Sequence, residues 1–239
     1  MYVWELARAS GADSRVLLRI EDHDRIRCRP EFESAIVDDL AWLGFVADGE
    51  LVRQSERTAL YEDALNSLRT RGLVYACACS RAEIGGERYP GTCAERNLPD
   101  VPGHGLRVRL DVTVERFDDL RLGPQAQQPS EQCGDLLLRD RDGNWTYQLA
   151  VVVDDWLQGI DTVIRGIDLL DSTGRQIQLG RHLGRTDPPR FYHHPLVMKS
   201  ATQKLSKSDR DTGVRELRAR GWSAQDVLAA VPMEVRPHN

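Results

Sequence analysis

Short apolar segments with the character of strands alternate along this chain with longer segments whose apolar residues recur at helical spacing. Residues 16–20 form a compact apolar run typical of a buried strand, and a helix is predicted to begin beyond it at Pro30. Residues 162–165 predict another strand, and a helix over residues 172–183 follows it. Such alternation favours an α/β fold built on a parallel sheet, because each helix returns the chain across the sheet.

The same two spacings predict the remaining elements. Apolar side chains line one face of the helix from Pro30 at positions Phe32, Ile36, Leu40 and Leu43. The other predicted elements are a helix over residues 1–9, a helix capped by Ser55, strands over residues 73–76, 106–112 and 194–198, a hairpin over residues 136–149 turning at Asp142-Gly143-Asn144, and short helices after Lys207, the last capped by Ser223.

Composition excludes several classes of protein. A chain with 41% hydrophobic and 29% charged residues has the balance of an ordinary globular protein, and it contains no apolar run long enough to cross a bilayer. The first residues lack a basic leader followed by an apolar stretch, so we expect a cytoplasmic protein rather than a secreted one. The odd number of cysteines, five, then favours reduced thiols or metal ligands over a disulfide framework.

The helical and strand patterns stop between residues 77 and 102, where glycine and proline are frequent. Cys77, Cys79 and Cys93 lie in or beside this irregular segment together with Tyr89. Three thiolates and a phenol oxygen have the donor number of a closed tetrahedral zinc site, with His104 as a competing ligand. Spacing alone leaves open a second interpretation, in which the thiols are simply buried and the tyrosine packs against the following proline.

Two further motifs carry groups suited to an amino-acid ligand. Glu21 lies near the end of the segment Leu18-Arg19-Ile20-Glu21-Asp22. At the carboxyl end of a parallel strand its carboxylate would face a ligand crevice and suit an α-ammonium group. Arg165 has the guanidinium geometry for a carboxylate, and Tyr147 offers a hydroxyl donor. Each residue taken singly is equally consistent with a structural ion pair or a core tyrosine.

The segment Lys204-Leu205-Ser206-Lys207-Ser208 places two ammonium groups and two hydroxyls on a loop. Such a loop is able to close over a triphosphate and neutralise the charge that develops on departing pyrophosphate. A solvated basic loop is the alternative interpretation when the segment is considered alone.

Taken together and in order, these motifs resemble the glutamyl-queuosine tRNA(Asp) synthetase family, a short relative of bacterial glutamyl-tRNA synthetase within class I. The loop at Lys204–Ser208 is similar to the KMSKS signature of that class. The resemblance implies a Rossmann-like parallel core that begins in residues 1–76, an inserted zinc-binding subdomain over 77–105, the rest of the insertion and the second half of the core over 106–199, and the signature loop with short helices over 200–239. It implies no anticodon-binding domain.

The resemblance also implies roles for individual residues. Glu21, Tyr147 and Arg165 would bind glutamate, Lys204 and Lys207 would act in catalysis, and residues 204–208 would bind ATP with magnesium. Zinc would be structural and held by Cys77, Cys79, Tyr89 and Cys93. The implied reaction is tRNA-independent activation of glutamate, followed by transfer to queuosine at the first anticodon position of tRNA(Asp), and we expect a monomer with no membrane partner.

One departure from the family changes the expected activity. Family members begin with a strand and a loop carrying the HIGH signature, which are missing ahead of Tyr2, so we expect a truncated chain that is inactive or unstable. Two other functions remain open on the sequence: a fragment of an ordinary glutamyl-tRNA synthetase that charges tRNA(Glu), and a noncatalytic paralogue that binds RNA or glutamate. A zinc-bound structural module is a third.

Overall fold

Three small sheets, rather than one continuous parallel sheet, are present in the described part of the chain. The computed structural model describes residues 1–22, 30–198 and 213–231. Within these residues β1 (Arg19–Ile20) pairs in parallel with β2 (Val52–Arg53). A second sheet is antiparallel, in the order β3 (Val74–Cys77), β4 (Gly105–Val108) and β7 (Leu136–Arg139).

The largest described sheet has four strands and joins segments far apart in the sequence. Its order is β6 (Gly123–Gln127), β5 (Glu115–Asp119), β9 (Arg190–His194) and β8 (Thr162–Gly166). The pair β5–β6 is antiparallel, whereas β9 runs parallel to both of its neighbours. The fold is therefore α/β, as the alternation predicts, but in place of the predicted parallel sheet the described residues form one parallel, one antiparallel and one mixed sheet.

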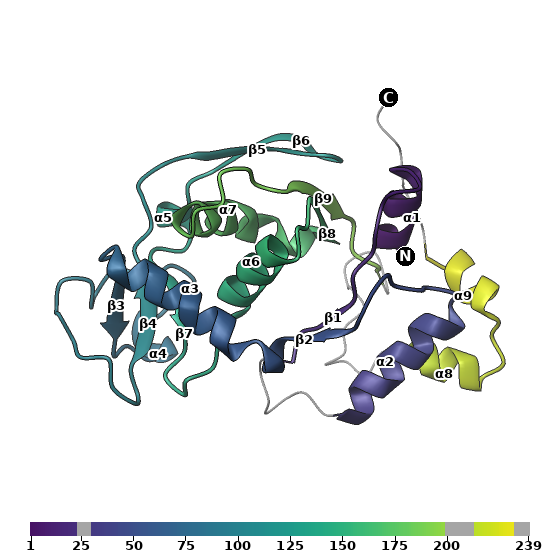
Figure 1. Cartoon of the computed structure of the whole chain (residues 1–239), viewed down its shortest axis with the longest axis horizontal. Helices are drawn as coiled ribbons and strands as arrows, with labels where there is room; N and C mark the ends of the chain where they lie inside the picture. The colour runs from purple at the N-terminus through teal and green to yellow at the C-terminus, as the bar shows by residue number, and fades with distance from the viewer. Residues whose placement is uncertain (23–29, 199–212, 232–239) are drawn as a thin grey trace.

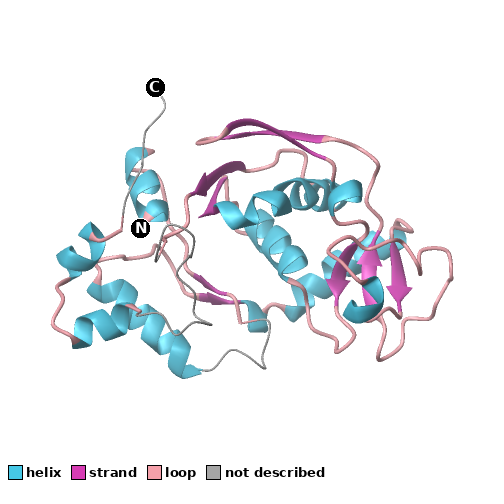
Figure 2. Cartoon of the chain, turned by 180° about the vertical axis from the view of Figure 1, so that it is seen from behind, coloured by secondary structure: helices cyan, strands magenta, loops and turns pink. Residues whose placement is uncertain are grey.

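Helices surround these sheets at both ends of the molecule (Figures 1 and 2). Figure 1 shows α2 with α8 and α9 at one end, the β3–β4–β7 sheet at the other, and α6 and α7 between them. The helices of the described residues are α1 (Tyr2–Ala9), α2 (Pro30–Trp42), α3 (Thr58–Thr70), α4 (Arg81–Ile84), α5 (Pro129–Gln132), α6 (Tyr147–Leu157), α7 (Thr173–His182), α8 (Val214–Ala219) and α9 (Ala224–Ala229), with 3-10 turns η1 (Gln54–Glu56) and η2 (Ile167–Ser172). Among the described residues, no helix combines the length and the apolar character that crossing a membrane requires.

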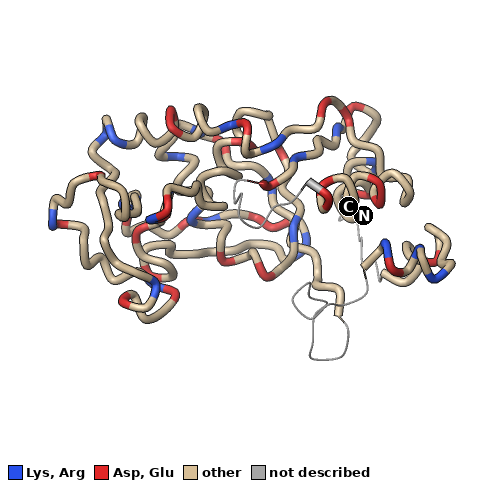
Figure 3. Tube along the Cα trace, turned by 90° about the horizontal axis from the view of Figure 1, so that it is seen from below, with Lys and Arg blue, Asp and Glu red and all other residues tan. Residues whose placement is uncertain are grey.

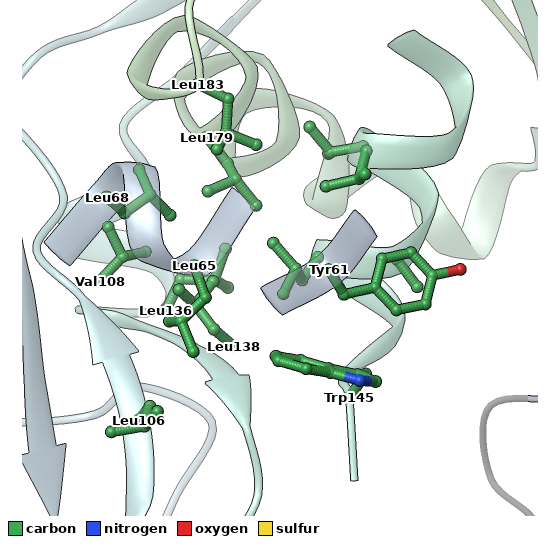
Figure 4. Close-up of a cluster of buried hydrophobic side chains, with 14 of the residues drawn as sticks. Tyr61, Leu65, Leu68, Leu106, Val108, Leu136, Leu138, Trp145, Leu179 and Leu183 are labelled. Atoms are coloured by element: carbon green, nitrogen blue, oxygen red, sulfur yellow. The ribbon is translucent and has the colours of Figure 1, made fainter. Parts of the chain in front are cut away.

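The main hydrophobic core lies where α3, α6 and α7 meet the three-stranded sheet (Figure 4). Tyr61, Leu65 and Leu68 form the buried face of α3, since all three are fully inaccessible to solvent. They pack with Leu138 of β7 and Leu179 of α7. Residues 149–154 of α6 are all buried, which makes this helix the central element of the molecule.

The predicted hairpin over residues 136–149 is wrong in its second arm. The turn forms, with the Gly143 amide donating to the Asp140 carbonyl, and Arg139 makes an isolated antiparallel bridge with Trp145. The chain then enters α6 at Tyr147 instead of continuing as a strand. Residues 149–154 of α6 are all buried, so the start of this helix shows no alternation of polar and apolar faces that would have marked it as helical in the sequence.

Two other predictions need correction. The last strand of the core is Arg190–His194, so the predicted strand over residues 194–198 is placed too late. Ser55 does not cap the helix that follows it, because α3 begins at Thr58 and the Ser55 hydroxyl donates instead to the carboxylate of Asp22 at 2.6 Å. The cap predicted at Ser223 is confirmed, since its hydroxyl accepts from the Asp226 amide.

Candidate functional site

The three residues predicted to bind an amino acid line one cavity of ≈ 340 Å³. Glu21 follows strand β1, Tyr147 is the first residue of α6, and Arg165 lies on β8. These elements come from three separate parts of the sequence. The fold therefore brings together a carboxylate, a phenol and a guanidinium as the motifs predict.

Arg165 is a buried cation whose hydrogen-bond partners are neutral. Only 8% of the residue is exposed, and its guanidinium donates to Gln176 at 2.5 Å, Thr173 at 2.8 Å and His193 at 3.0 Å. Among the described residues, Arg165 makes no ion pair with a carboxylate within 4.0 Å. Burial lowers the pKa of Arg165, and the nearby Tyr147 and Asp155 offset this decrease only in part. A buried and uncompensated guanidinium on a cavity wall is suited to an anionic ligand.

Glu21 brings a carboxylate to the same cavity, which Asp155 also lines. The Glu21 side chain is 46% exposed and its carboxylate lies 3.8 Å from the guanidinium of Arg19. Arg19 is held on the far side by Asp155 at 2.9 Å and by Gln158 at 2.8 Å. Burial is the largest single effect on the pKa of Arg19 and lowers it, but the acidic neighbours Asp155, Asp154 and Glu21 together raise this pKa overall. The cavity thus presents a carboxylate and a guanidinium from different elements to one bound molecule.

Tyr147 lies beside Arg165 and is held near it by the start of α6. Burial raises the pKa of its phenol, against the neighbouring positive charge of Arg165, so the hydroxyl keeps its proton at neutral pH. A protonated phenol is able to donate a hydrogen bond to an anion that Arg165 binds.

A buried carboxylate fixes the elements around the cavity. Asp154 of α6 has no solvent exposure and accepts hydrogen bonds from Arg57 Nε at 2.6 Å, Gln54 Nε2 at 2.8 Å and the Tyr61 hydroxyl at 2.9 Å. Arg19 Nε lies 3.6 Å away from the same carboxylate. These contacts tie α6 to η1, to the start of α3 and to β1, and so they position Tyr147 relative to Glu21.

A second candidate site groups the sulfur atoms of Cys77, Cys79 and Cys93, all within 4.8 Å of one another. The Tyr89 hydroxyl lies 3.4 Å from Cys77 Sγ and accepts from the Cys93 amide at 2.8 Å. Sulfur ligands 2.3 Å from a tetrahedral zinc stand about 3.8 Å apart, and Cys79 and Cys93 are already 3.6 Å apart. The donor atoms present therefore fit a thiolate-bound zinc ion.

The electrostatics of this cluster favour one thiolate. Burial alone would raise the pKa of Cys93, but hydrogen bonds from the Ala78 amide and neighbouring side chains lower it to about 7. Burial and the adjacent thiols raise the pKa of Cys79 to about 11. The competing ligand His104 is not part of the group, since its Nδ1 bonds to the Pro99 carbonyl at 2.8 Å.

The loop predicted to bind ATP, Lys204 to Ser208, lies outside the described residues. Three residues that contact Arg165, namely Thr173, Gln176 and His193, were not predicted as part of the site. Thr173 and Gln176 lie in α7, which follows the Arg165 motif in the sequence. Their spacing of three residues places both on one face of this helix, and this spacing was the signal in the sequence that could have grouped them. His193 is on a different strand, and nothing local in the sequence links it to Arg165.

Charges of both signs are interleaved over the described chain (Figure 3). Arg181, for example, forms an ion pair with the buried Glu115, and Arg190 lies 3.9 Å from Asp161. Arg181 and Arg190 are thus both close to acidic neighbours.

Comparisons with known proteins agree on the family. The family model for the catalytic domain of class I tRNA synthetases (E and Q) matches residues 1–100 and 100–231. The chain is 46% identical over 221 residues to a protein of Bordetella bronchiseptica named Glutamyl-Q tRNA(Asp) synthetase, covering 85% of this chain and 69% of that one. A protein of the same name from Rhodobacter capsulatus is 37% identical over 250 residues, with 93% and 89% covered.

A solved structure has the same architecture. The glutamate tRNA ligase of Elizabethkingia meningosepticum, crystallised in complex with its amino acid, superposes with a TM-score of 0.74 at 25% sequence identity. The match covers 87% of this chain and 48% of the ligase, so the chain spans about half the length of that enzyme.

Proposed function

This chain belongs to the class I tRNA synthetases (E and Q), and we propose that it activates glutamate with ATP and transfers it to the queuosine of tRNA(Asp). The acceptor is taken from the names of relatives that are 37–46% identical. The amino acid is supported independently by the chemistry of the cavity.

The convergence of Glu21, Tyr147 and Arg165 on one cavity carries the proposal. Arg165 binds the side-chain carboxylate of glutamate, Tyr147 donates its hydroxyl to that carboxylate, and Glu21 accepts from the α-ammonium group. Glutamine presents a neutral amide to the same guanidinium and would leave the buried charge uncompensated. The cavity therefore suits the acid better than its amide.

Two steps complete the proposed reaction. A carboxylate oxygen of glutamate attacks the α-phosphorus of ATP, the bond to pyrophosphate breaks, and glutamyl-adenylate forms. A hydroxyl of the nucleic acid then attacks the acyl carbon, loses its proton and releases AMP. We assign charge neutralisation on pyrophosphate to Lys204 and Lys207, within the ATP-binding loop of residues 204–208, together with magnesium.

We assign a structural role to zinc. Cys77, Cys79, Cys93 and Tyr89 would hold it, and a closed site with four protein ligands leaves no position for substrate. On this proposal residues 77–105 form a metal-stabilised unit inserted into a catalytic core that runs through residues 1–76 and 106–199.

Pyrophosphate exchange tests the first step. The proposed function predicts glutamate-dependent exchange between ATP and pyrophosphate without tRNA, in contrast to the inactivity expected of a truncated chain, and it predicts the loss of this exchange in Arg165→Met. Arg190→Met is the matched control, because this arginine is 61% exposed and its carboxylate partner, at 3.9 Å, is surface-exposed. Exchange supported equally by glutamine, or undiminished in Arg165→Met, contradicts the proposed role of the cavity.

Acceptor assays test the second step. We expect labelled glutamate to appear on purified tRNA(Asp) that carries queuosine and not on the same tRNA with guanosine at that position. Transfer to tRNA(Glu) alone would instead identify an ordinary glutamyl-tRNA synthetase, the function suggested by the similarity to the Elizabethkingia enzyme. Binding of glutamate without exchange would identify a noncatalytic relative.

A further inference from the structure

Arg165 and His193 are neighbours across two parallel strands. The register of β8 and β9 places Arg165 opposite His193, so their side chains share a face of the sheet. On the next strand, β5, Asp119 pairs with Phe191, two residues before His193, and therefore lies on this face as well. The topology thus lines up a guanidinium, an imidazole and a carboxylate in one row.

Short contacts connect the three groups. His193 Nδ1 lies 2.6 Å from Asp119 Oδ2, and His193 Nε2 accepts from Arg165 Nε at 3.0 Å. His193 has no solvent exposure, and Asp119 and Arg165 are 3% and 8% exposed. The row is closed to water, so each group depends on its neighbours for hydrogen bonds.

The contacts of Asp119 determine the tautomer of His193. Asp119 Oδ1 accepts from the amides of Arg121 and Leu122, and Oδ2 accepts from the amide of His193 as well as from its ring. A carboxylate with donors at both oxygens requires the proton of the imidazole on Nδ1. Nε2 of His193 then carries no proton, and its lone pair accepts the hydrogen bond from the Nε–H of Arg165.

We propose that His193, oriented by Asp119, is a positioning residue that fixes the guanidinium of Arg165 for the side-chain carboxylate of glutamate. This inference rests on the proposed function and adds residues that do not touch the substrate. His193 accepts a hydrogen bond from Nε of Arg165, and Thr173 and Gln176 each accept one from a terminal nitrogen of the same guanidinium. The plane of the guanidinium is therefore fixed before a ligand binds.

Two substitutions separate positioning from simple structural support. The amide oxygen of a glutamine reaches the place of Nε2, so His193→Gln keeps an acceptor for Arg165. The shorter asparagine places its amide near Nδ1, so His193→Asn keeps the contact to Asp119 and removes the acceptor. We expect His193→Asn to raise the KM for glutamate by up to about 100-fold with the KM for ATP unchanged, and His193→Gln to recover much of that loss.

Controls distinguish the possible failures. His182→Gln is the matched control, because this histidine of α7 is also buried, at 6% exposure, but contacts Asp111 instead of Arg165. Thermal unfolding identifies variants that lose the fold, and calorimetric binding of glutamate provides a readout independent of exchange. Asp119→Asn is expected to shift the glutamate KM in the same direction as His193→Asn.

Each outcome decides a different claim. Wild-type protein that binds no glutamate overturns the proposed function and this inference with it. Wild-type protein that binds glutamate, with folded His193→Asn binding it within twofold as well, overturns the positioning role alone. Equal increases in the KM for glutamate and for ATP would indicate a general structural defect and also reject the inference.

Discussion

Asp154 is the residue whose removal should disturb the molecule most. Its carboxylate is fully buried and accepts from Arg57, Gln54 and Tyr61, so Asp154→Ala would remove the anion that these three side chains share. We expect a loss of roughly 3–5 kcal/mol in the free energy of unfolding. Urea denaturation measures it, with the exposed Asp161→Ala as control. A loss as small as that of the control would mean that water replaces these contacts.

The buried histidines predict how stability depends on pH. Burial lowers the pKa of His193 and of His182 below the ordinary value of 6.5. Between the folded and unfolded pKa values the unfolded chain binds more protons, so stability is complete above pH 6.5 and falls as the pH drops below it. We expect the double variant His193→Gln, His182→Gln to lose stability less steeply than wild type in this window, as followed by unfolding midpoints. Identical slopes would contradict the lowered pKa values.

Sequence motifs predicted the residues that face the cavity but not those that orient them. Glu21, Tyr147 and Arg165 sit in runs that are recognisable at a fixed spacing. His193 and Asp119 reach Arg165 only through the register of β8, β9 and β5, which depends on long-range pairing. Local pattern carries no information on such pairing, and this is why the supporting residues of the site could not be predicted.

At the scale of the elements, Gly134 has the least room for a side chain among the described glycines, because the Tyr89 backbone lies against it. Gly134 adopts φ +65°, and a Cβ there would lie 2.0 Å from the Tyr89 carbonyl oxygen. Gly143 has a similar φ, +87°, but nothing lies within 4 Å of its Cβ position. We expect Gly143→Ala to cost about 1 kcal/mol from φ strain alone, and Gly134→Ala to cost more and to weaken metal binding. Unfolding and zinc competition assays compare the two; equal costs would exclude the clash.

Among the strands that the sequence did not predict, β5 alternates between buried and exposed residues, but its buried positions are mostly polar. Glu115, Phe117 and Asp119 are buried while Arg116 and Asp118 are exposed. Two of the three inward positions are thus acidic, which hides the period of two from a hydrophobic pattern. Their burial is possible because Arg181 pairs with Glu115 and His193 with Asp119. The mixed character of the largest sheet follows from this strand and could not be predicted without it.

At the scale of the whole molecule, the residues around the cysteines are organised separately from the main core. Cys77, Tyr89 and Cys93 form a small buried cluster of their own, distinct from the core of α3, α6 and α7. The regular structure between residues 78 and 104 is limited to α4, a four-residue helix with a capping box. So little buried apolar surface is consistent with the proposal that a bound metal helps to order this unit.

We therefore expect metal removal to unfold one part of the molecule and not the other. After chelation, amides of residues 78–104 should exchange with solvent rapidly, whereas amides of α3 and α6 should keep their protection, as measured by hydrogen exchange with mass spectrometry. Cys93→Ser should have the same effect without chelator. Cys133→Ser is the matched control, because this buried cysteine contacts the Pro129 carbonyl and lies outside the group of three thiols. Slow exchange in residues 78–104 after complete removal of metal would mean that packing alone, and not zinc, holds this unit together.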